Sequence, residues 1–229
     1  RDLFRLGGEI GLQQEPALES DPAPSELMKW YIVGVLMLVY VFNFVDRQII
    51  SVLQEPMRLE LGLSDTQLGL IQGLTFAVFY VTMGIPLARW ADVGVRRDVV
   101  ALSVGVGSIM TALCGLAQNF TQLLLARIGV GIGEAGGSPP SHSIISDLFP
   151  PGRRALPLSI YSFGITFGVF LAYVFGAWVS DNFGWRHVFI ALGIPGVLLA
   201  LLVRFSVPEP LRGRYDPPGA NRDPPAMLT

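Results

Sequence analysis

Six long apolar stretches occupy most of this 229-residue chain. They run from about Leu27 to Leu53, Asp65 to Trp90, Asp98 to Ala117, Phe120 to Phe149, Leu158 to Ser180 and Trp185 to Val207. A bilayer core about 30 Å thick is crossed by about 20 mostly apolar helical residues. Each stretch has that length and is nearly uncharged. A soluble helical bundle would not require six nearly uncharged helices of this length. The sequence therefore predicts an all-α integral membrane protein with six transmembrane helices.

The composition excludes other classes. Only 15% of residues are charged, against about a quarter in soluble domains. The net charge of −2 lacks the basic excess typical of nucleic-acid-binding proteins, so we expect membrane lipid and no nucleic acid as partners. The chain has a single cysteine, Cys114, which lies in an apolar run. One cysteine alone excludes an intrachain disulfide and a thiolate metal cluster. We expect no metal and no cofactor.

Three regions follow from this pattern. Residues 1–26 mix acidic residues, proline and glutamine without the apolar core of a signal peptide, and we expect a mobile cytoplasmic tail. Residues 27–207 form the six-helix transmembrane domain. Residues 208–229 are rich in proline and aperiodic, which indicates a cytoplasmic linker or a truncated end.

The basic residues predict the orientation. Six crossings place both termini on one side of the membrane, and arginine and lysine concentrate on the cytoplasmic side. Twelve of the 16 basic residues lie on the side of the termini, and only Arg58 and Arg186 lie on the opposite side. We therefore expect a multi-pass protein of the cell membrane with both termini in the cytoplasm.

Two similar turns indicate an internal repeat. Asp92-Val93-Gly94-Val95-Arg96-Arg97 and Asp181-Asn182-Phe183-Gly184-Trp185-Arg186 each join the second and third helices of a set of three. An odd number of helices inverts the second set relative to the first. The prediction is an inverted 3+3 repeat.

The repeat relates two acids within the spans. The offset between the turns brings Asp46 in the first span to within one residue of Glu134 in the fourth. At 1.5 Å per residue, Asp46 lies about 24 Å from Trp30, and Glu134 lies about 21 Å from Phe120, at mirrored depths.

Each acid has a basic companion: Arg47 is next to Asp46, and Arg127 is two helical turns before Glu134. A charge in mid-helix costs about 2.5 to 3.5 kcal/mol on insertion scales, so these four groups should face one another or a wet cavity. Our preferred contact is Arg47 with Glu134, and Asn43 is placed to hydrogen-bond Asp46 or Arg47. The alternatives are a proton or substrate site and an ion-pair network that only clamps the first and fourth helices.

At this point the chain resembles a known family. Its loop motif, its helix-four motif and two further motifs look like those of the major facilitator superfamily. These are Ala88 to Arg97 with Asp92, Gly94, Arg96 and Arg97; Arg127 with Gly131, Gly133 and Glu134; Gly184-Trp185-Arg186; and Pro208-Glu209-Pro210. Ala88 and Val93 depart from the usual loop motif, and no proline follows Gly164 and Gly168 in the fifth span.

Within that superfamily, Asn43-Phe44-Val45-Asp46-Arg47 and Gly131 to Ala135 are similar to the spinster-like transporters, some of which export lysolipids or sphingoid lipids. The resemblance implies the amino-terminal half of a twelve-helix secondary transporter, with a separate or missing carboxy-terminal six-helix half. It implies alternating access with proton coupling and a small organic or lipid-like, amphipathic solute. Asp46 and Glu134 would carry protons, and Asn43, Arg47 and Arg127 would contact substrate or form ion pairs. Asp92, Gly94, Arg96 and Arg97 would form a cytoplasmic gate, in which the Asp92 carboxylate meets the two arginines or a facing helix end.

Two other functions stay open on the residues alone. Ser138 and His187 would suit an intramembrane serine protease if they met across helices, although we expect no catalytic residue. A nontransporting membrane scaffold is the other alternative.

Overall fold

The computed structural model describes residues 24–215, so residues 1–23 of the predicted amino-terminal tail and residues 216–229 of the segment 208–229 lie outside the described residues. Within residues 24–215 all regular structure is helical, as predicted. The elements are α1 (Glu26–Leu61), α2 (Asp65–Gly69), the π-helical η1 (Leu70–Leu74), α3 (Thr75–Val93), α4 (Arg96–Cys114), α5 (Phe120–Glu134), α6 (Ser138–Leu148), the 3₁₀ turn η2 (Pro151–Arg153), α7 (Ala155–Phe183) and α8 (Trp185–Ser206).

Five of the six predicted spans are helices long and apolar enough to cross a membrane. They are α1, the continuous run Asp65–Val93, α4, α7 and α8. Helix α1 starts at the cap residue Ser25, whose side chain accepts a hydrogen bond from the Met28 amide, and it ends at Gly62 with φ 63°. Only glycine adopts that left-handed conformation without strain.

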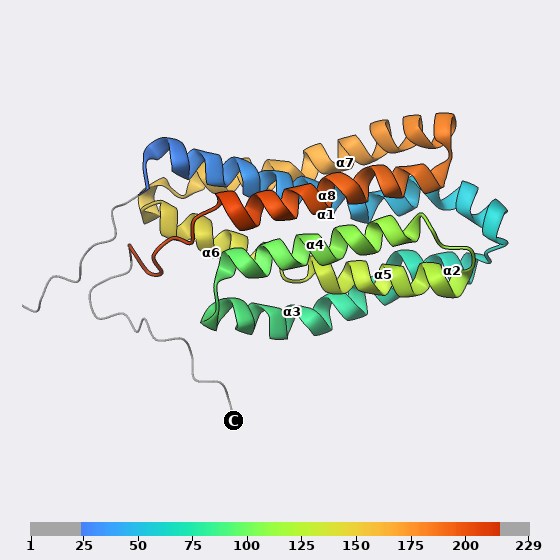
Figure 1. Ribbon diagram of the computed structural model, residues 1–229, viewed down its shortest axis with the longest axis horizontal. Helices are drawn as coiled ribbons and strands as arrows, with labels where there is room; N and C mark the ends of the chain where they lie inside the picture. The colour runs from blue at the N-terminus through green and yellow to red at the C-terminus, as the bar shows by residue number, and fades with distance from the viewer. Residues whose placement is uncertain (1–23, 216–229) are drawn as a thin grey trace, which may run out of the picture.

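The fourth span is the exception. We predicted a single span from Phe120 to Phe149 that bends at Pro139 and Pro140, but the helix ends at Glu134 and restarts at Ser138. Pro139 and Pro140 follow directly, and proline has no amide hydrogen to continue a helical ladder, although the first turn of a new helix tolerates it. Helices α5 and α6 thus share one crossing in two pieces (Figure 1).

The connections gather at the two ends of an elongated bundle (Figure 1). The start of α1, the turn at Gly94, the segment at Pro150 and the end of α8 lie at one end, and the loops near Leu63, residue 118 and Gly184 lie at the other. The first and last described residues are therefore at the same end of the bundle, which agrees with an even number of crossings.

The helix pairs follow the inverted repeat. The largest interhelical contacts join α1 with α7, α4 with α8, and α3 with α5, apart from the neighbours α4 and α5. In order of crossing these are helices one with five, three with six, and two with four. A pseudo-twofold axis exchanges crossings one, two and three with crossings four, five and six. This exchange converts the pair of one with five into the pair of four with two, and it leaves the pair of three with six unchanged.

Small residues allow the closest of these contacts. A Cβ atom added to Gly168 of α7 would lie 2.6 Å from the carbonyl oxygen of Val41 on α1. Gly133 of α5 similarly faces the backbone of Gly107 on α4. These glycines bring the backbones of neighbouring membrane helices together.

Candidate functional site

The expected contact between the first and fourth spans is formed. Arg47 Nε on α1 donates to Glu134 Oε2 on α5 at 2.7 Å. The arginine side chain is 27% exposed, whereas the glutamate side chain is 2% exposed. Glu134 is therefore buried, and Arg47 is the more exposed side chain of the pair.

A second contact joins the other acid and base. Arg127 Nη1 on α5 donates to the backbone carbonyl oxygen of Asp46 on α1 at 3.2 Å. Both residues are buried. The four charged residues thus lie together, with each arginine turned toward the helix of the opposite acid.

Thr111 is a member of the cluster that the sequence did not suggest. Its hydroxyl on α4 donates to Asp46 Oδ2 at 3.0 Å, and its side chain is fully buried. A threonine in an apolar helix carries no pattern that distinguishes it from a packing residue, so no sequence signal was available.

Asn43 is buried on α1 but occupies another position. Its amide nitrogen lies beside Gly137, at the break between α5 and α6. Among the hydrogen bonds of the described residues, none joins it to Asp46 or Arg47. The predicted hydrogen bond is wrong, because the break in the fourth span brings a backbone turn against Asn43.

Aromatic rings surround the Arg47 guanidinium. Its carbon lies 4.6 Å from the ring centre of Tyr80 and 5.2 Å from those of Phe44 and Phe76. Cation–π contacts of this kind contribute about 0.5 to 2 kcal/mol, more when water is excluded. The spacing of Phe76 and Tyr80, one helical turn apart, was a signal that sequence reasoning missed.

Three buried polar atoms of the cluster have no hydrogen-bond partner among the described residues. They are Asp46 Oδ1, Arg127 Nε and Glu134 Oε1. A buried group left unsatisfied costs about 1 to 3 kcal/mol. The cluster therefore keeps two buried carboxylate oxygens and one guanidinium nitrogen unsatisfied at a cost in stability.

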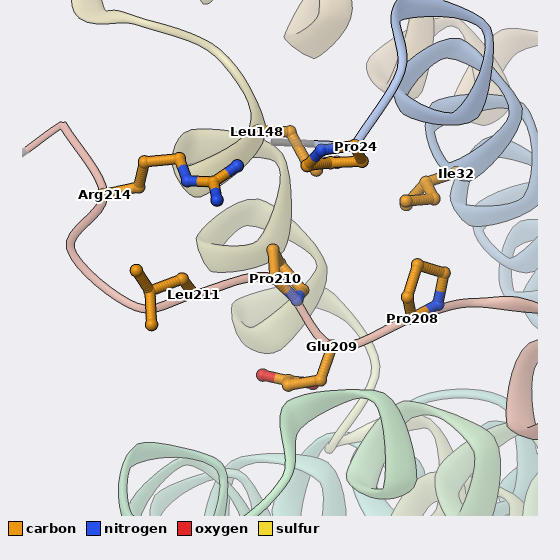
Figure 2. Close-up of a pocket in the computed structure, with 8 residues that line it drawn as sticks. All are labelled: Pro24, Ile32, Leu148, Pro208, Glu209, Pro210, Leu211 and Arg214. Atoms are coloured by element: carbon orange, nitrogen blue, oxygen red, sulfur yellow. The ribbon is translucent and has the colours of Figure 1, made fainter. Parts of the chain in front are cut away.

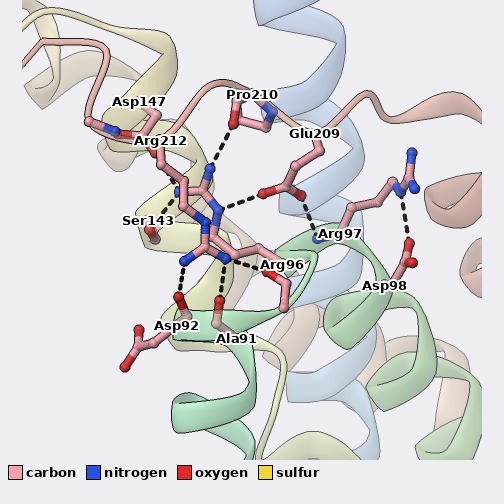
Figure 3. A network of polar contacts seen from close by, with 12 residues as sticks. Ala91, Asp92, Arg96, Arg97, Asp98, Ser143, Asp147, Glu209, Pro210 and Arg212 are labelled. Carbon is pink, nitrogen blue, oxygen red and sulfur yellow. Dashed lines mark hydrogen bonds and ion pairs between the residues drawn. The ribbon is translucent and has the colours of Figure 1, made fainter. Parts of the chain in front are cut away.

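A second network lies at the end of the bundle that holds the described termini (Figure 3). Arg96, the first residue of α4, donates to Glu209 Oε1 at 2.7 Å and to the Asp147 carboxylate on α6. Glu209 also accepts from the backbone amide of Arg97 at 2.9 Å. Arg96 is buried. Its bonds to Glu209 and Asp147 hold the segment after α8 against the start of α4 and the end of α6.

Asp92 does not take the predicted part in this network. Its carboxylate is exposed and points away from Arg96 and Arg97 (Figure 3). Instead, the backbone carbonyl groups of Ala91, Asp92 and Gly94 accept hydrogen bonds from the Arg212 side chain. The end of α3 has unpaired carbonyl groups, and a cation from the segment after α8 satisfies them.

A small cavity of about 180 Å³ lies beside this network (Figure 2). Ile32, Leu148 and residues 208–211 line it together with Arg214. Its acidic group, Glu209, is bound to Arg96. The cavity is therefore a feature of the packed segment after α8 and not of the charge cluster.

The opposite end of the bundle has its own arginine. Arg186 Nη1 at the start of α8 donates to the carbonyl oxygen of Gly115 at 3.1 Å and to that of Ala117. Glu60 at the end of α1 accepts from Trp185 Nε1 at 2.6 Å and from Arg186 Nε at 3.0 Å. Arg186 thus binds carbonyl groups at the end of α4, whereas at the other end of the bundle Arg212, from outside the loop, binds those at the end of α3.

The residues for the protease alternative are on separate elements. Ser138 starts α6, whereas His187 lies in the first turn of α8, at the end of the bundle away from α6 (Figure 1). Within residues 24–215, no group of three or more His, Cys, Asp or Glu side chains is arranged to hold a metal ion.

The sequence matches a family profile described as Major Facilitator Superfamily over residues 36–227. Among curated proteins, it is 42% identical over 178 residues to an MFS-type efflux pump of Mycolicibacterium smegmatis, which covers 78% of this chain and 42% of the pump. It is 31% identical over 192 residues to Protein spinster of Drosophila melanogaster, covering 82% of this chain and 31% of that protein.

Solved structures agree with these relatives. A bacterial homologue of the human lysosomal transporter Spinster, in an inward-facing and occupied conformation, matches with a TM-score of 0.79 and 42% identity, over 85% of this chain and 48% of that one. Its inward-facing, unoccupied structure gives a TM-score of 0.80 over 86% of this chain and 47% of that one. The chain spans less than half the length of the curated relatives named here.

Proposed function

The chain belongs to the major facilitator superfamily and is spinster-like, and from this premise we propose that it forms the amino-terminal half of a proton-coupled secondary transporter that works by alternating access. Transporters of this kind rock two halves about a site near the middle of the membrane. The proposed location is the cell membrane, with both termini in the cytoplasm.

The observation that carries the proposal is the buried pair of Arg47 and Glu134, 2.7 Å apart on different helices. A proton on Glu134 would cancel its negative charge and weaken its hold on Arg47. Arg47 would then be free to move within its aromatic surroundings or to bind a solute. Asp46, buried beside Arg127, is the second proton carrier.

The solute that we propose is organic, amphipathic or lipid-like, with an anionic group for Arg47. Arg47 is more exposed than Asp46, Arg127 and Glu134, so it is the first of the four charged residues that a solute would meet. Related proteins carry the names Probable L-galactonate transporter (Escherichia coli) and Sphingosine-1-phosphate transporter SPNS2 (Danio rerio), and both of these solutes contain an anion.

Six further helices would complete the transporter. The run Asp65–Val93 and α7 are the least buried of the five long helices. Large apolar side chains of both helices, such as Val78, Val81, Phe163 and Phe170, are exposed within the described residues, as would be expected if a second half packed there. The Arg96 network, with Arg97 and the turn at Asp92 and Gly94, would act as the cytoplasmic gate between the halves.

The experiment uses the full-length transporter in proteoliposomes with an imposed pH gradient. Radiolabelled L-galactonate, D-glucarate and sphingosine-1-phosphate form the first panel of solutes. We expect at least one to move against its concentration gradient, and a protonophore to abolish that movement. Transport that continues unchanged after the pH gradient is collapsed would contradict proton coupling.

A further inference from the structure

One hydroxyl group holds the Asp46 side chain. Thr111 Oγ1 donates to Asp46 Oδ2 at 3.0 Å, and Oδ1 is buried without a partner. Within the described part of the chain, the Asp46 carboxylate takes part in no ion pair, since Arg127 reaches its backbone carbonyl instead. The orientation of this carboxylate therefore depends on Thr111.

We propose that Thr111 is a positioning residue that orients the Asp46 carboxylate for proton binding. This inference rests on the proposed function, in which Asp46 carries a coupling proton. A hydroxyl group suits this task because it can both donate and accept hydrogen bonds. It donates to Oδ2 and leaves Oδ1 open for the proton.

The charged and titratable surroundings of Asp46 come from three helices. Glu134 and Arg127 face it from α5, Cys114 faces it from α4 one turn after the uncharged Thr111, and Arg47 follows it on α1. Glu134 and Arg127 act on Asp46 with opposite sign. The hydrogen bond from Thr111 favours the charged form of the carboxylate, so its removal should make Asp46 easier to protonate.

Thr111 also connects helices that otherwise touch little. Helix α1 packs mainly on α7, and α4 packs mainly on α8 and α5. The bond from Thr111 crosses from α4 to the middle of α1, where both residues are buried. A change of protonation at Asp46 therefore alters a contact of the third crossing as well as of the first.

The test uses Thr111→Val, which keeps the side-chain shape and removes the hydroxyl group, and Thr111→Ser, which keeps the hydroxyl group. Thr82→Val is the matched control, because the Thr82 hydroxyl donates to the carbonyl oxygen of Val78 on exposed α3. Infrared difference spectra between low and high pH are recorded on the purified full-length protein without solute. The carboxylic acid C=O band of Asp46 is the one lost in Asp46→Asn.

In Thr111→Val we expect this band to move to higher frequency, because the C=O group loses a hydrogen bond. We expect the pH midpoint of the band to rise by about one unit. Thr111→Ser and Thr82→Val should keep the parental band and midpoint. Thr111→Ala, which lacks the hydroxyl group in a smaller side chain, should reproduce the shift of Thr111→Val and separates it from an effect of crowding.

The outcomes separate the two proposals. If Asp46→Asn removes a band that Thr111→Val and Thr111→Ala leave unshifted, the role of Thr111 is wrong and Asp46 still binds a proton. If Asp46→Asn leaves the pH difference spectrum unchanged, Asp46 does not titrate, and the proton role assigned to it in the proposed function fails.

Discussion

Arg47 is held by two kinds of interaction at the scale of single residues. Glu134 binds its guanidinium by an ion pair, and the rings of Phe44, Phe76 and Tyr80 surround it. In the proposed mechanism, the rings would not change charge when Glu134 takes up a proton. They would therefore keep Arg47 close to the site in both protonation states.

We predict that the contact between Arg47 and Glu134 is energetically coupled. In a double-mutant cycle with Arg47→Met and Glu134→Gln, the coupling should be about 1 to 3 kcal/mol in the free energy of unfolding, since Glu134 is buried and hydrogen-bonded. Denaturation of the full-length protein in mixed micelles measures it.

The exposed pair of Arg58 and Glu55 is the control for this cycle. It is of the same chemical type, but it lies within one helix and in solvent, where such pairs contribute little. No measurable coupling is expected there. A cycle that gave equal coupling for both pairs would show that burial does not strengthen the contact of Arg47 with Glu134.

The sequence predicted the charged residues of the cluster but not their neighbours. Asp46, Arg47, Arg127 and Glu134 are conspicuous because charge is costly in an apolar run. The hydroxyl of Thr111 is ordinary in a membrane helix, and only its hydrogen bond from α4 to Asp46 on α1 gives it a part in the cluster.

At the scale of helices, the number of crossings and their apolar character were predictable from the sequence, but the position of the break in the fourth crossing was not. Apolar length alone determined the five long helices. In the fourth span, Pro139 and Pro140 indicated a bend, yet the break falls earlier, between Glu134 and Ser138. At this break Gly137 lies beside Asn43 of α1, and the two residues meet from distant parts of the chain.

The Arg96 network shows the same limit. The loop arginines were recognised from their motif, whereas Asp147 and Glu209 lie 51 and 113 residues away from Arg96. Hydrophobic periodicity carries no information about which distant acid an arginine will meet. Asp92 was expected to meet the two arginines or a facing helix end because it closes the second helix, but its carboxylate is exposed and points away from them.

We predict that Arg96→Gln loosens the segment after α8. Loss of the bonds to Asp147 and Glu209 should also free the acids that bind the amides of Arg97 and Gly213. Hydrogen exchange at these two amides should accelerate about tenfold, corresponding to about 1.4 kcal/mol of local stability. Mass spectrometry of peptides covering residues 95–99 and 208–214 measures it.

Arg204→Gln is the control, because Arg204 is more exposed and lies 3.5 Å from Asp98. It should leave exchange at Arg97 and Gly213 unchanged. Unaltered protection in Arg96→Gln would mean that the segment after α8 is held without this arginine, and the proposed gate would lose its basis.

At the scale of the whole molecule, the described chain ends are on one side and the repeat pairs helices across a pseudo-twofold axis. We predict that this side is cytoplasmic, from the concentration of basic residues there. In a Cys114→Ser background, Asn182→Cys should react with a membrane-impermeant maleimide on intact cells. Gly152→Cys should react only after permeabilisation.

Both labelling positions are exposed in the structure, and the native cysteine is buried, so differences in reactivity will report the side of the membrane. Labelling of position 152 on intact cells, with position 182 protected, would invert the orientation.

The central claim is that a buried acid of this chain couples proton movement to solute movement, and one comparison tests it most directly. In proteoliposomes of the full-length transporter, Asp46→Asn keeps the size of the side chain and removes its titratable charge. With any solute that the parent accumulates, the variant should still exchange solute across the membrane but should not accumulate it against a gradient when a pH gradient is imposed. Accumulation by Asp46→Asn to the parental level would contradict the claim and favour an ion-pair network that only clamps the helices.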